Sequence, residues 1–263
     1  MKRLTIIAGN CIIENLNTSI ETVEFLLKQA DLYNFELIYK SSFKKDNRSS
    51  EKYYTGLSLD ESTRIFKHLK NTYGVNVLTD FHNLYELNHE IINCIDIIQV
   101  PAYLCMQTEL VVAMARTGKT INIKKGQFLH PEDVEKIVKK IESVGNKRII
   151  LTERGTCFGY RDLIVDPRSF YILKQLGYPV IFDVGHSVRK YGVPSSDLDK
   201  GGAKEYINTL ASAAIATGID GIFVEVHPDP PSALCDAATQ LSFNEFIRLM
   251  YIINPIWKAV NPA

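Results

Sequence analysis

The sequence predicts a (β/α)8 barrel, and three observations lead to this prediction. Short apolar runs rich in β-branched residues recur eight times along the 263 residues. Segments with helical spacing lie between many of these runs. Several of these segments stop at a glycine shortly before the next run, which is where helices commonly end. Eight strand–helix alternations in a chain of this length are typical of a parallel barrel covered by helices.

The eight runs carry apolar residues on both alternating faces, as strands covered by helices do. In chain order they are 4–9, 36–40, 75–82, 96–101, 120–125, 148–154, 179–186 and 221–227. The clearest helical segments are 19–33, 60–74, 132–145 and 203–218. Because the chain has no linker-like or low-complexity segment, we interpret residues 1–263 as a single barrel domain. A doubly wound open sheet is the alternative, but no G-x-G-x-x-G motif follows the first strand.

Composition argues against several classes of protein. The 30 basic and 30 acidic residues give a net charge of zero, which disfavours electrostatic binding to nucleic acid or to an anionic membrane. The five cysteines are odd in number and form no C-x-x-C pair, which fits a reducing compartment better than a disulfide framework. No stretch approaches the roughly 20 apolar residues of a membrane span, and the first apolar run is too short for a signal peptide. We therefore expect a soluble, cytoplasmic protein.

Polar side chains follow every predicted strand, at the end of the barrel where active sites lie. In strand order they are Asn10 with Cys11, Lys40, Asp80 with His82, Gln99, Lys124 with Lys125, Glu153 with Arg154, Asp183 with His186, and Glu225 with His227. One polar strand end is most simply a solvated rim residue. Polar groups at all eight ends indicate a functional site at the barrel mouth.

Several cations are predicted to meet at the mouth of the barrel. Lys40, Lys124 and Arg154 end strands two, five and six, and Lys45 and Arg48 follow strand two. Each alone is most simply a surface charge. Arginine offers bidentate contacts to phosphate or carboxylate and lysine a compact charge, so together they predict a site for a small, highly anionic ligand.

A second cluster has the chemistry of a metal site. Cys11, His186 and Glu225 end strands one, seven and eight, which become neighbours when the barrel closes, and Asp236 lies on the loop after strand eight. This mixed set of sulfur, nitrogen and oxygen ligands suits Zn²⁺ or Fe²⁺ and suits Mn²⁺ less well. The alternative is that the cysteine fills space and the histidine is a hydrogen-bonded rim residue. The other cysteines, Cys94, Cys105, Cys157 and Cys235, are interpreted as structural.

The stretch KSSFKKDNRSS (40–50) closely resembles the K-A-S-F-x-K-A-N-R-S-S signature of the 3-deoxy-D-manno-octulosonate 8-phosphate synthases. The resemblance continues through TDFH (79–82), IQVPAYL (98–104), INIKKGQF (121–128), ERGTCFGY (153–160), VIFDVGHS (180–187) and EVHPDP (225–230). It covers nearly the whole chain. The family is a (β/α)8 barrel, usually a homotetramer, that condenses phosphoenolpyruvate with D-arabinose 5-phosphate and water and releases phosphate.

The resemblance also implies roles for individual residues. Phosphoenolpyruvate would be held by Lys40, Lys124 and Arg154, and the sugar phosphate by Asn47, Arg48 and Ser49. Four further residues complete the predicted substrate-binding set: Ser42, Lys45, Gln99 and Ala102. The groups predicted to act in catalysis are His186, His82, Asp80 and Lys124, without an individual assignment of acid and base.

Within this family, metal-independent enzymes carry asparagine where this chain has Cys11. Cys11, together with Ala237 after Asp236, therefore resembles the metal-dependent class. Two departures concern the sugar side. Met106 stands where relatives carry an arginine that reaches a neighbouring subunit's site, and Asp46 replaces an alanine within the phosphate-binding stretch. Two alternatives follow, namely a related synthase with another sugar acceptor and, more remotely, an inactive barrel that acts as a binding protein.

Overall fold

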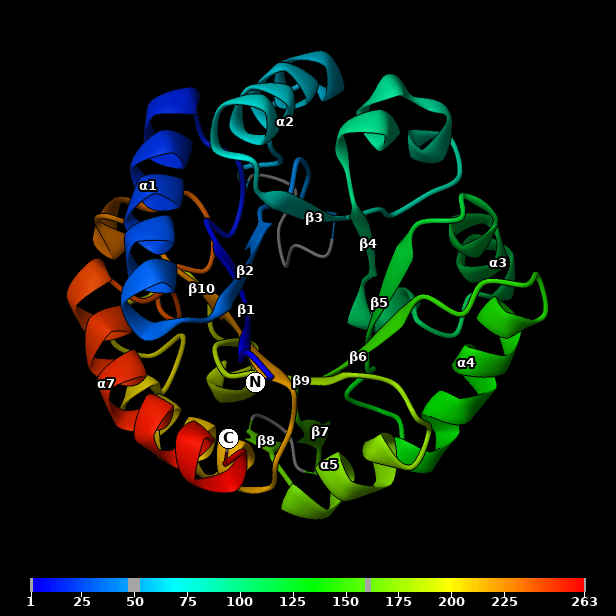
Figure 1. The fold of residues 1–263 in the computed structure, drawn as a ribbon. Coiled ribbons are helices and arrows are strands. Elements are labelled where there is room, and N and C mark those ends of the chain that lie inside the picture. Colours follow the sequence, from blue (N-terminus) through cyan, green and yellow to red (C-terminus); the bar gives the residue numbers. More distant parts are fainter. Residues whose placement is uncertain (1, 47–52, 159–161, 263) are drawn as a thin grey trace.

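The computed structural model shows a closed barrel of parallel strands surrounded by helices, and it describes residues 2–46, 53–158 and 162–262 (Figure 1). The barrel strands are β1 (Thr5–Gly9), β2 (Glu36–Lys40), β3 (Asn76–Asp80), β4 (Ile97–Val100), β5 (Thr120–Lys124), β6 (Ile149–Glu153), β9 (Val180–Asp183) and β10 (Gly221–Glu225). Neighbouring strands pair in parallel, and β10 pairs with β1 to close the ring. The (β/α)8 prediction is therefore confirmed, and the open sheet is excluded.

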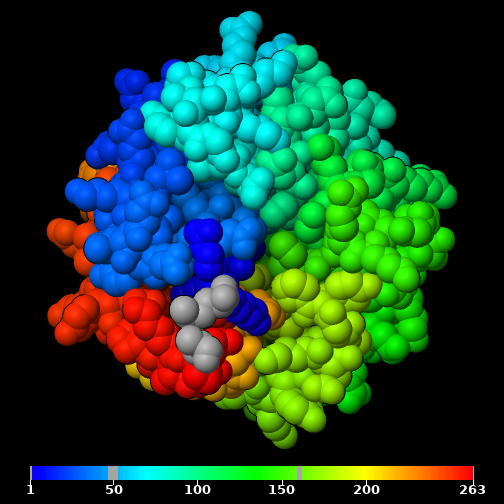
Figure 2. Space-filling view, viewed as in Figure 1, coloured from blue at the N-terminus to red at the C-terminus, as the bar shows by residue number. Residues whose placement is uncertain are grey.

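Helices form the outer ring in chain order. The α-helices are α1 (Leu16–Tyr33), α2 (Leu59–Tyr73), α3 (Thr108–Arg116), α4 (Val134–Glu142), α5 (Pro167–Lys174), α6 (Ile207–Ala216) and α7 (Phe243–Val260). The final helix α7 packs against both α6 and α1 and so completes the ring. The colours of the space-filling view follow the sequence around this face, which shows that each strand–helix unit lies beside the next (Figure 2).

Short 3-10 helices occupy several of the connections. They are η1 (Glu86–Asn88), η2 (Glu90–Cys94), η3 (Ala102–Leu104), η4 (Pro131–Asp133), η5 (His186–Val188), η6 (Lys204–Tyr206) and η7 (Pro230–Ser232). Between β3 and β4, η1 and η2 stand where the other units have an α-helix, and η2 packs against α2. None of the described helices has the length and apolar character that crossing a bilayer requires.

Local signals explain where the elements begin and end. Helix α1 starts three residues before the predicted segment, because the side chain of Asn15 accepts a hydrogen bond from the Thr18 amide at 2.9 Å and caps the first turn. Helix α2 ends as predicted at Gly74, whose φ of +66° few other residues adopt readily. The sequence did not predict helix α7 or the small hairpin of β7 (Thr156–Cys157) and β8 (Leu163–Ile164).

The barrel interior consists of an apolar layer below a polar one. The apolar layer contains Ile7, Ile38, Leu78, Ile97, Ile181 and Phe223. Because side chains alternate along a strand, the residues two positions further on point inward as well. These positions carry the side chains of Lys40, Asp80, Gln99, Asp183 and Glu225 at the carboxyl ends of their strands. The same alternation brings Lys124 and Arg154 to the mouth.

Not every polar strand end contributes to this layer, which corrects part of the sequence prediction. Lys125 and Glu153 lie one residue out of phase and pair with each other at 3.4 Å outside the barrel interior. Asn10 donates a hydrogen bond to Thr22 of α1, and His227 lies 3.4 Å from Glu14. A shift of one residue exchanges the two faces of a strand. Lys125 and Glu153 therefore contact the loops after β5 and β6, where Lys125 donates a hydrogen bond to Thr156 and Glu153 accepts one from the Gly155 amide.

Candidate active site

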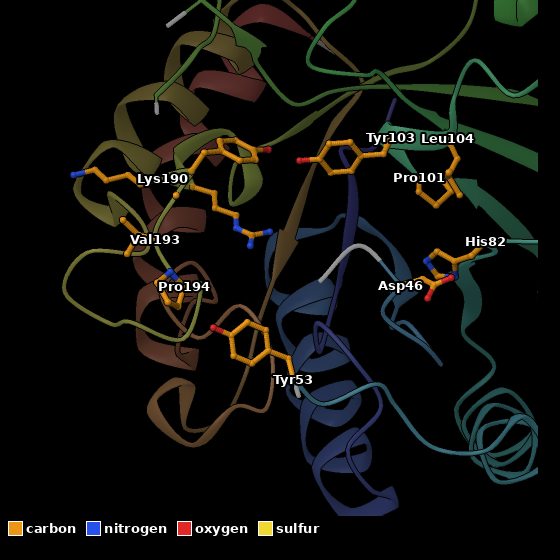
Figure 3. Close-up of a pocket in the computed structure, with 12 residues that line it drawn as sticks. Asp46, Tyr53, His82, Pro101, Tyr103, Leu104, Lys190, Val193 and Pro194 are labelled. Carbon is orange, nitrogen blue, oxygen red and sulfur yellow. The ribbon is translucent and has the colours of Figure 1, made fainter. Parts of the chain in front are cut away.

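A cavity of about 720 Å³ opens at the carboxyl ends of the strands. Its labelled lining residues form two opposing walls, with Tyr103, His82 and Asp46 on one side and Val193 and Pro194 on the other (Figure 3). Tyr53 lies between the walls, whereas Lys190 extends away from the space between them. A volume of this size is sufficient for small phosphorylated metabolites.

Two buried lysines flank Phe223, the aromatic member of the apolar layer. The Nζ atoms of Lys40 and Lys124 lie 5.5 and 4.2 Å from the centre of its ring. Lys40 is also 3.1 Å from a Glu225 carboxylate oxygen, and it donates a hydrogen bond to Ser42 at 3.1 Å. The structure thus brings together the predicted residues Lys40, Ser42 and Lys124 at the floor of the barrel mouth.

Lys124 belongs to a buried chain of three charged or titratable groups. Its Nζ lies 2.6 Å from an Asp183 oxygen and 3.4 Å from His186 Nδ1, which is itself 3.0 Å from Asp183. Burial lowers the pKa of Lys124 and of His186, although the Asp183 carboxylate opposes this in both. Burial alone would raise the pKa of Asp183, but His186 and Lys124 hold it well below its usual range. The lowered pKa of His186 favours the neutral imidazole, which is the form that accepts a proton or binds a metal.

Arg154 is also buried at the mouth, with 3% of its surface exposed. Its Nη1 donates a hydrogen bond to the Tyr191 hydroxyl at 2.8 Å, and its Nη2 donates one to the His186 carbonyl at 3.1 Å. His186 thus contacts both cations, because its carbonyl binds the Arg154 guanidinium and its ring lies 3.4 Å from Lys124 Nζ.

Asp80 and His82 form a second polar pair. His82 Nε2 lies 3.1 Å from an Asp80 oxygen, and Asp80 also accepts a hydrogen bond from Ser42. Burial alone would raise the pKa of Asp80, but the hydrogen bond from His82 and the charges of Lys40 and His82 hold it well below its usual range. Lys45 is buried near Glu225 at 3.8 Å, so it also joins the site.

The four predicted metal ligands converge on one side of the mouth. His186 Nε2 lies 3.9 Å from both Glu225 and Asp236 oxygens, and Cys11 Sγ lies 3.3 Å from Asp236. Asp236 has the positive φ of +46°, and its carbonyl accepts hydrogen bonds from the amides of Thr239 and Gln240. This uncommon backbone conformation is held by the turn after it and directs the carboxylate toward the strand ends.

The candidate ligand atoms form two groups that share Asp236, and each group has the chemistry of a cation site. Those of His186, Glu225 and Asp236 lie within 4.8 Å of one another, as do those of Cys11, Cys235 and Asp236. Burial raises the pKa of the Cys11 thiol well above its usual value. A bound cation would reverse this by stabilising the thiolate. A sulfur–nitrogen–oxygen set of this kind suits Zn²⁺ or Fe²⁺.

Two residues beside these ligands were not predicted to be there. Cys235 was interpreted as structural and outside the cluster, but its Sγ lies within 4.8 Å of the Cys11 sulfur, which corrects that interpretation. Arg189 Nη1 lies 3.6 Å from an Asp236 oxygen. Burial alone would lower the pKa of Arg189, but Asp236 raises it. The guanidinium thus partly offsets the negative charge of the ligands.

The remaining predicted residues are distributed as follows. Gln99 is buried in the polar layer and accepts a hydrogen bond from Asn122 at 3.2 Å. Ala102 is buried between the cavity-lining residues Pro101 and Tyr103. Asn47, Arg48 and Ser49 lie outside the described residues. Asp46 lines the cavity, and one of its oxygens lies 3.3 Å from Lys44 Nζ.

Sequence reasoning missed the contribution of the loop after β9. Arg189, Tyr191 and Val193 all line the cavity, and Tyr191 contacts Arg154 directly. No motif marked these residues, and the only available signal was their position after a barrel strand. Asp183 was noted as a polar strand end but was not assigned to the site, although it is the counter-ion of Lys124.

Comparison with known proteins agrees with this geometry. Residues 1–260 match the model of the DAHP synthetase I family. The chain is 44% identical over 247 residues to a 2-dehydro-3-deoxyphosphooctonate aldolase of Trichlorobacter lovleyi, covering 94% of this chain and 90% of the relative. It is 43% identical over 258 residues to one from Geobacter sp. strain M21, covering 98% and 93%. One from Geotalea daltonii is 45% identical over 247 residues, covering 94% and 90%. The chain therefore belongs to the 2-dehydro-3-deoxyphosphooctonate aldolases, within the DAHP synthetase I family.

Proposed function

We propose that this chain condenses phosphoenolpyruvate with D-arabinose 5-phosphate and water, giving 3-deoxy-D-manno-octulosonate 8-phosphate and inorganic phosphate. The observation that carries the proposal is the buried group of strand-end cations, Lys40, Lys124 and Arg154, at the mouth of one barrel. The name of the similar proteins, 2-dehydro-3-deoxyphosphooctonate aldolase, supports the same reaction.

The cations explain how two anionic substrates can be brought together. Phosphoenolpyruvate and a sugar phosphate repel each other in water, and fixed positive charges in a buried site offset this repulsion without reorganising during the reaction. Lys40 and Lys124 supply compact charges near the Phe223 ring, and Arg154 supplies a planar group for a carboxylate or phosphate. These residues bind phosphoenolpyruvate in the proposed mechanism.

The reaction then requires one new carbon–carbon bond and one broken carbon–oxygen bond. C3 of phosphoenolpyruvate attacks the sugar aldehyde, water adds at C2, and the tetrahedral intermediate releases phosphate by cleavage of its C2–O bond. Protons must leave the water and reach the new hydroxyl group. His186 and the Asp80–His82 pair lie at the mouth and are the groups that we propose to transfer them.

We further propose that Cys11, His186, Glu225 and Asp236 hold a divalent metal ion, as in the metal-dependent class. The proposal is supported by the grouping of His186 and Glu225 around Asp236, and by the contact of Cys11 with the same carboxylate. When bound, the ion would orient and polarise the sugar's carbonyl end or the attacking water. Burial alone would raise the pKa of Glu225, but Lys40, His186 and Lys45 lower it.

The sugar side carries the two departures from relatives. Met106 is 37% exposed, and its carbonyl accepts a hydrogen bond from Lys140 at 2.9 Å. An apolar side chain there cannot supply the cation that relatives place in a neighbouring subunit. Asp46 adds a carboxylate to the cavity wall, but Lys44 is its partner. We propose that arabinose 5-phosphate remains the acceptor, and testing other sugars addresses the alternative.

We also propose that the chain forms a homotetramer and acts in the cytoplasm. Exposed aromatic side chains near the strand ends support self-association: Phe158 is 89% exposed, Phe128 56% and Tyr103 48%. The Cys157 amide donates a hydrogen bond to the Gln127 carbonyl, so Phe158 and Phe128 each follow one of two hydrogen-bonded residues. Five free thiols support a reducing compartment. Light scattering of the purified protein gives the oligomeric state.

The decisive experiment measures phosphate release from phosphoenolpyruvate with D-arabinose 5-phosphate, with and without a chelator. Rapid release that chelator stops and added Zn²⁺ or Fe²⁺ restores is the expected result. D-Arabinose, D-ribose 5-phosphate and D-erythrose 4-phosphate serve as matched acceptors. Release with one of these in preference to arabinose 5-phosphate would identify another acceptor, and no release with any of them would refute the proposed reaction.

A further inference from the structure

Tyr191 places its hydroxyl group where several strand-end loops meet. Its oxygen accepts a hydrogen bond from Arg154 Nη1 at 2.8 Å and another from Gln127 Nε2 at 3.0 Å. Tyr103 lies beside it, and burial together with the neighbouring Tyr191 raises the pKa of Tyr103 to about 12. The loops after β4, β5, β6 and β9 are therefore joined through one phenol group.

Arg154 differs from the other cations of the site in how its charge is balanced. Lys40 pairs with Glu225 and Lys124 with Asp183. In the part of the chain that the structure describes, no carboxylate lies within ion-pair distance of the Arg154 guanidinium. Its two contacts are neutral oxygens, those of Tyr191 and of the His186 carbonyl. Arg154 therefore retains an uncompensated positive charge in a buried position.

One edge of this guanidinium is also free. The Nε of Arg154 is buried and has no hydrogen-bond partner among the described residues. Leaving a buried donor of a charged group unpaired is unfavourable, so such a donor in a site indicates a missing acceptor. An anion that approached this edge would receive hydrogen bonds from Nε and one Nη in the bidentate geometry typical of arginine.

We propose that Tyr191 is a positioning residue, which fixes the plane of Arg154 so that its Nε edge faces phosphoenolpyruvate. This inference rests on the proposed function. The arginine side chain has several rotatable bonds, and two fixed acceptors on its Nη atoms restrict its orientation before substrate arrives. Because a phenol oxygen is neutral, it orients the guanidinium without cancelling the charge that the substrate needs. A carboxylate in the same place would orient it but would compete with the anion.

The test is Tyr191→Phe, which removes the hydroxyl and keeps the ring. We expect the KM and the calorimetric Kd for phosphoenolpyruvate to rise about tenfold, the lower end of what a hydrogen bond to a charged group contributes. The KM for arabinose 5-phosphate and the melting temperature should stay close to those of the wild type. Tyr206→Phe is the matched control, because Tyr206 is exposed and lies in η6, and it should leave all four quantities unchanged.

A double-mutant cycle shows whether Tyr191 acts through Arg154. In an Arg154→Lys background there is no planar group to orient, so adding Tyr191→Phe should change phosphoenolpyruvate affinity less than twofold. A tenfold further loss in that background would overturn the inference. If Tyr191→Phe does not fold, Gln127→Met removes the second donor to Tyr191, and we expect a rise of about threefold in the same KM.

The outcomes separate this inference from the proposed function. If the wild type neither binds phosphoenolpyruvate nor releases phosphate from it, the proposed function fails and the role of Tyr191 fails with it. If the wild type binds phosphoenolpyruvate and Tyr191→Phe binds it equally well, only the positioning role is refuted. A lowered melting temperature with unchanged phosphoenolpyruvate affinity would show that Tyr191 has a structural role alone.

Discussion

Lys124 is both the proposed ligand of phosphoenolpyruvate and the counter-ion of a buried carboxylate, and replacing it by alanine tests both roles. Its Nζ lies 2.6 Å from Asp183, whose side chain is fully buried. Removing one partner of a buried ion pair leaves the other charge uncompensated and typically lowers stability by about 3–5 kcal/mol. His186 remains 3.0 Å from Asp183 and retains part of the compensation, so we expect the lower end of that range.

The loss of substrate binding follows from a separate interaction. A hydrogen bond between charged groups contributes about 1.5–3 kcal/mol, so Lys124→Ala should weaken phosphoenolpyruvate binding by about 10- to 150-fold. Calorimetry measures this affinity, and urea unfolding measures the free energy of unfolding. The two effects must be separated, since an unfolded variant would also fail to bind.

The double variant Lys124→Ala with Asp183→Asn makes this separation. Asparagine removes the stranded charge and keeps much of the shape, so part of the lost stability should return while phosphoenolpyruvate binding stays weak. Unchanged affinity in Lys124→Ala would refute the assignment of Lys124 to this substrate. Full recovery of binding in the double variant would show that the single change acted only through the stranded Asp183 carboxylate.

Three further predictions concern the metal, the acceptor and the dependence on pH. Cys11→Asn should reduce the metal content measured by elemental analysis. Cys157→Ser is the control, because Cys157 is exposed, and it should leave the metal content unchanged. Equal metal content in the two variants would exclude Cys11 as a ligand. Asp46→Ala should lower the KM for arabinose 5-phosphate about two- to fivefold by removing a carboxylate from the cavity wall, without affecting phosphate-free arabinose. Asp60→Ala is its control, because Asp60 is an exposed residue at the start of α2. The pKa of Asp80 is held low in the folded protein. Ionised Asp80 therefore contributes to the free energy of unfolding at pH values above its unfolded pKa of about 4, and this contribution is lost as the pH falls toward the folded pKa. Stability should therefore fall less steeply between about pH 5 and about pH 3 in Asp80→Asn than in the wild type, and equal slopes would contradict this reasoning.

Local patterns in the chain were sufficient to predict the barrel and the ring of polar side chains at its strand ends. Apolar runs that alternate with amphipathic segments can bury their surfaces in few ways, and Gly74 shows how one residue ends a helix before the next strand. The period of two along each strand also predicts that Lys40, Asp80, Lys124 and Glu225 share the barrel interior. The carboxyl ends of the strands converge because the strands are parallel and close into one barrel.

Only the tertiary structure decided which further residues join them. Lys125 and Glu153 looked equivalent to their neighbours in sequence, but a shift of one residue turns them out of the barrel interior and toward the loops after β5 and β6. Cys235, Arg189 and Tyr191 reach the site from loops, whose paths depend on contacts with distant segments and not on a local repeat. The sequence by itself determined the ring of strand-end charges, because the strand period is a local property. The residues that orient those charges lie on loops. The conformation of these loops depends on packing against distant parts of the chain, so the local sequence does not predict it.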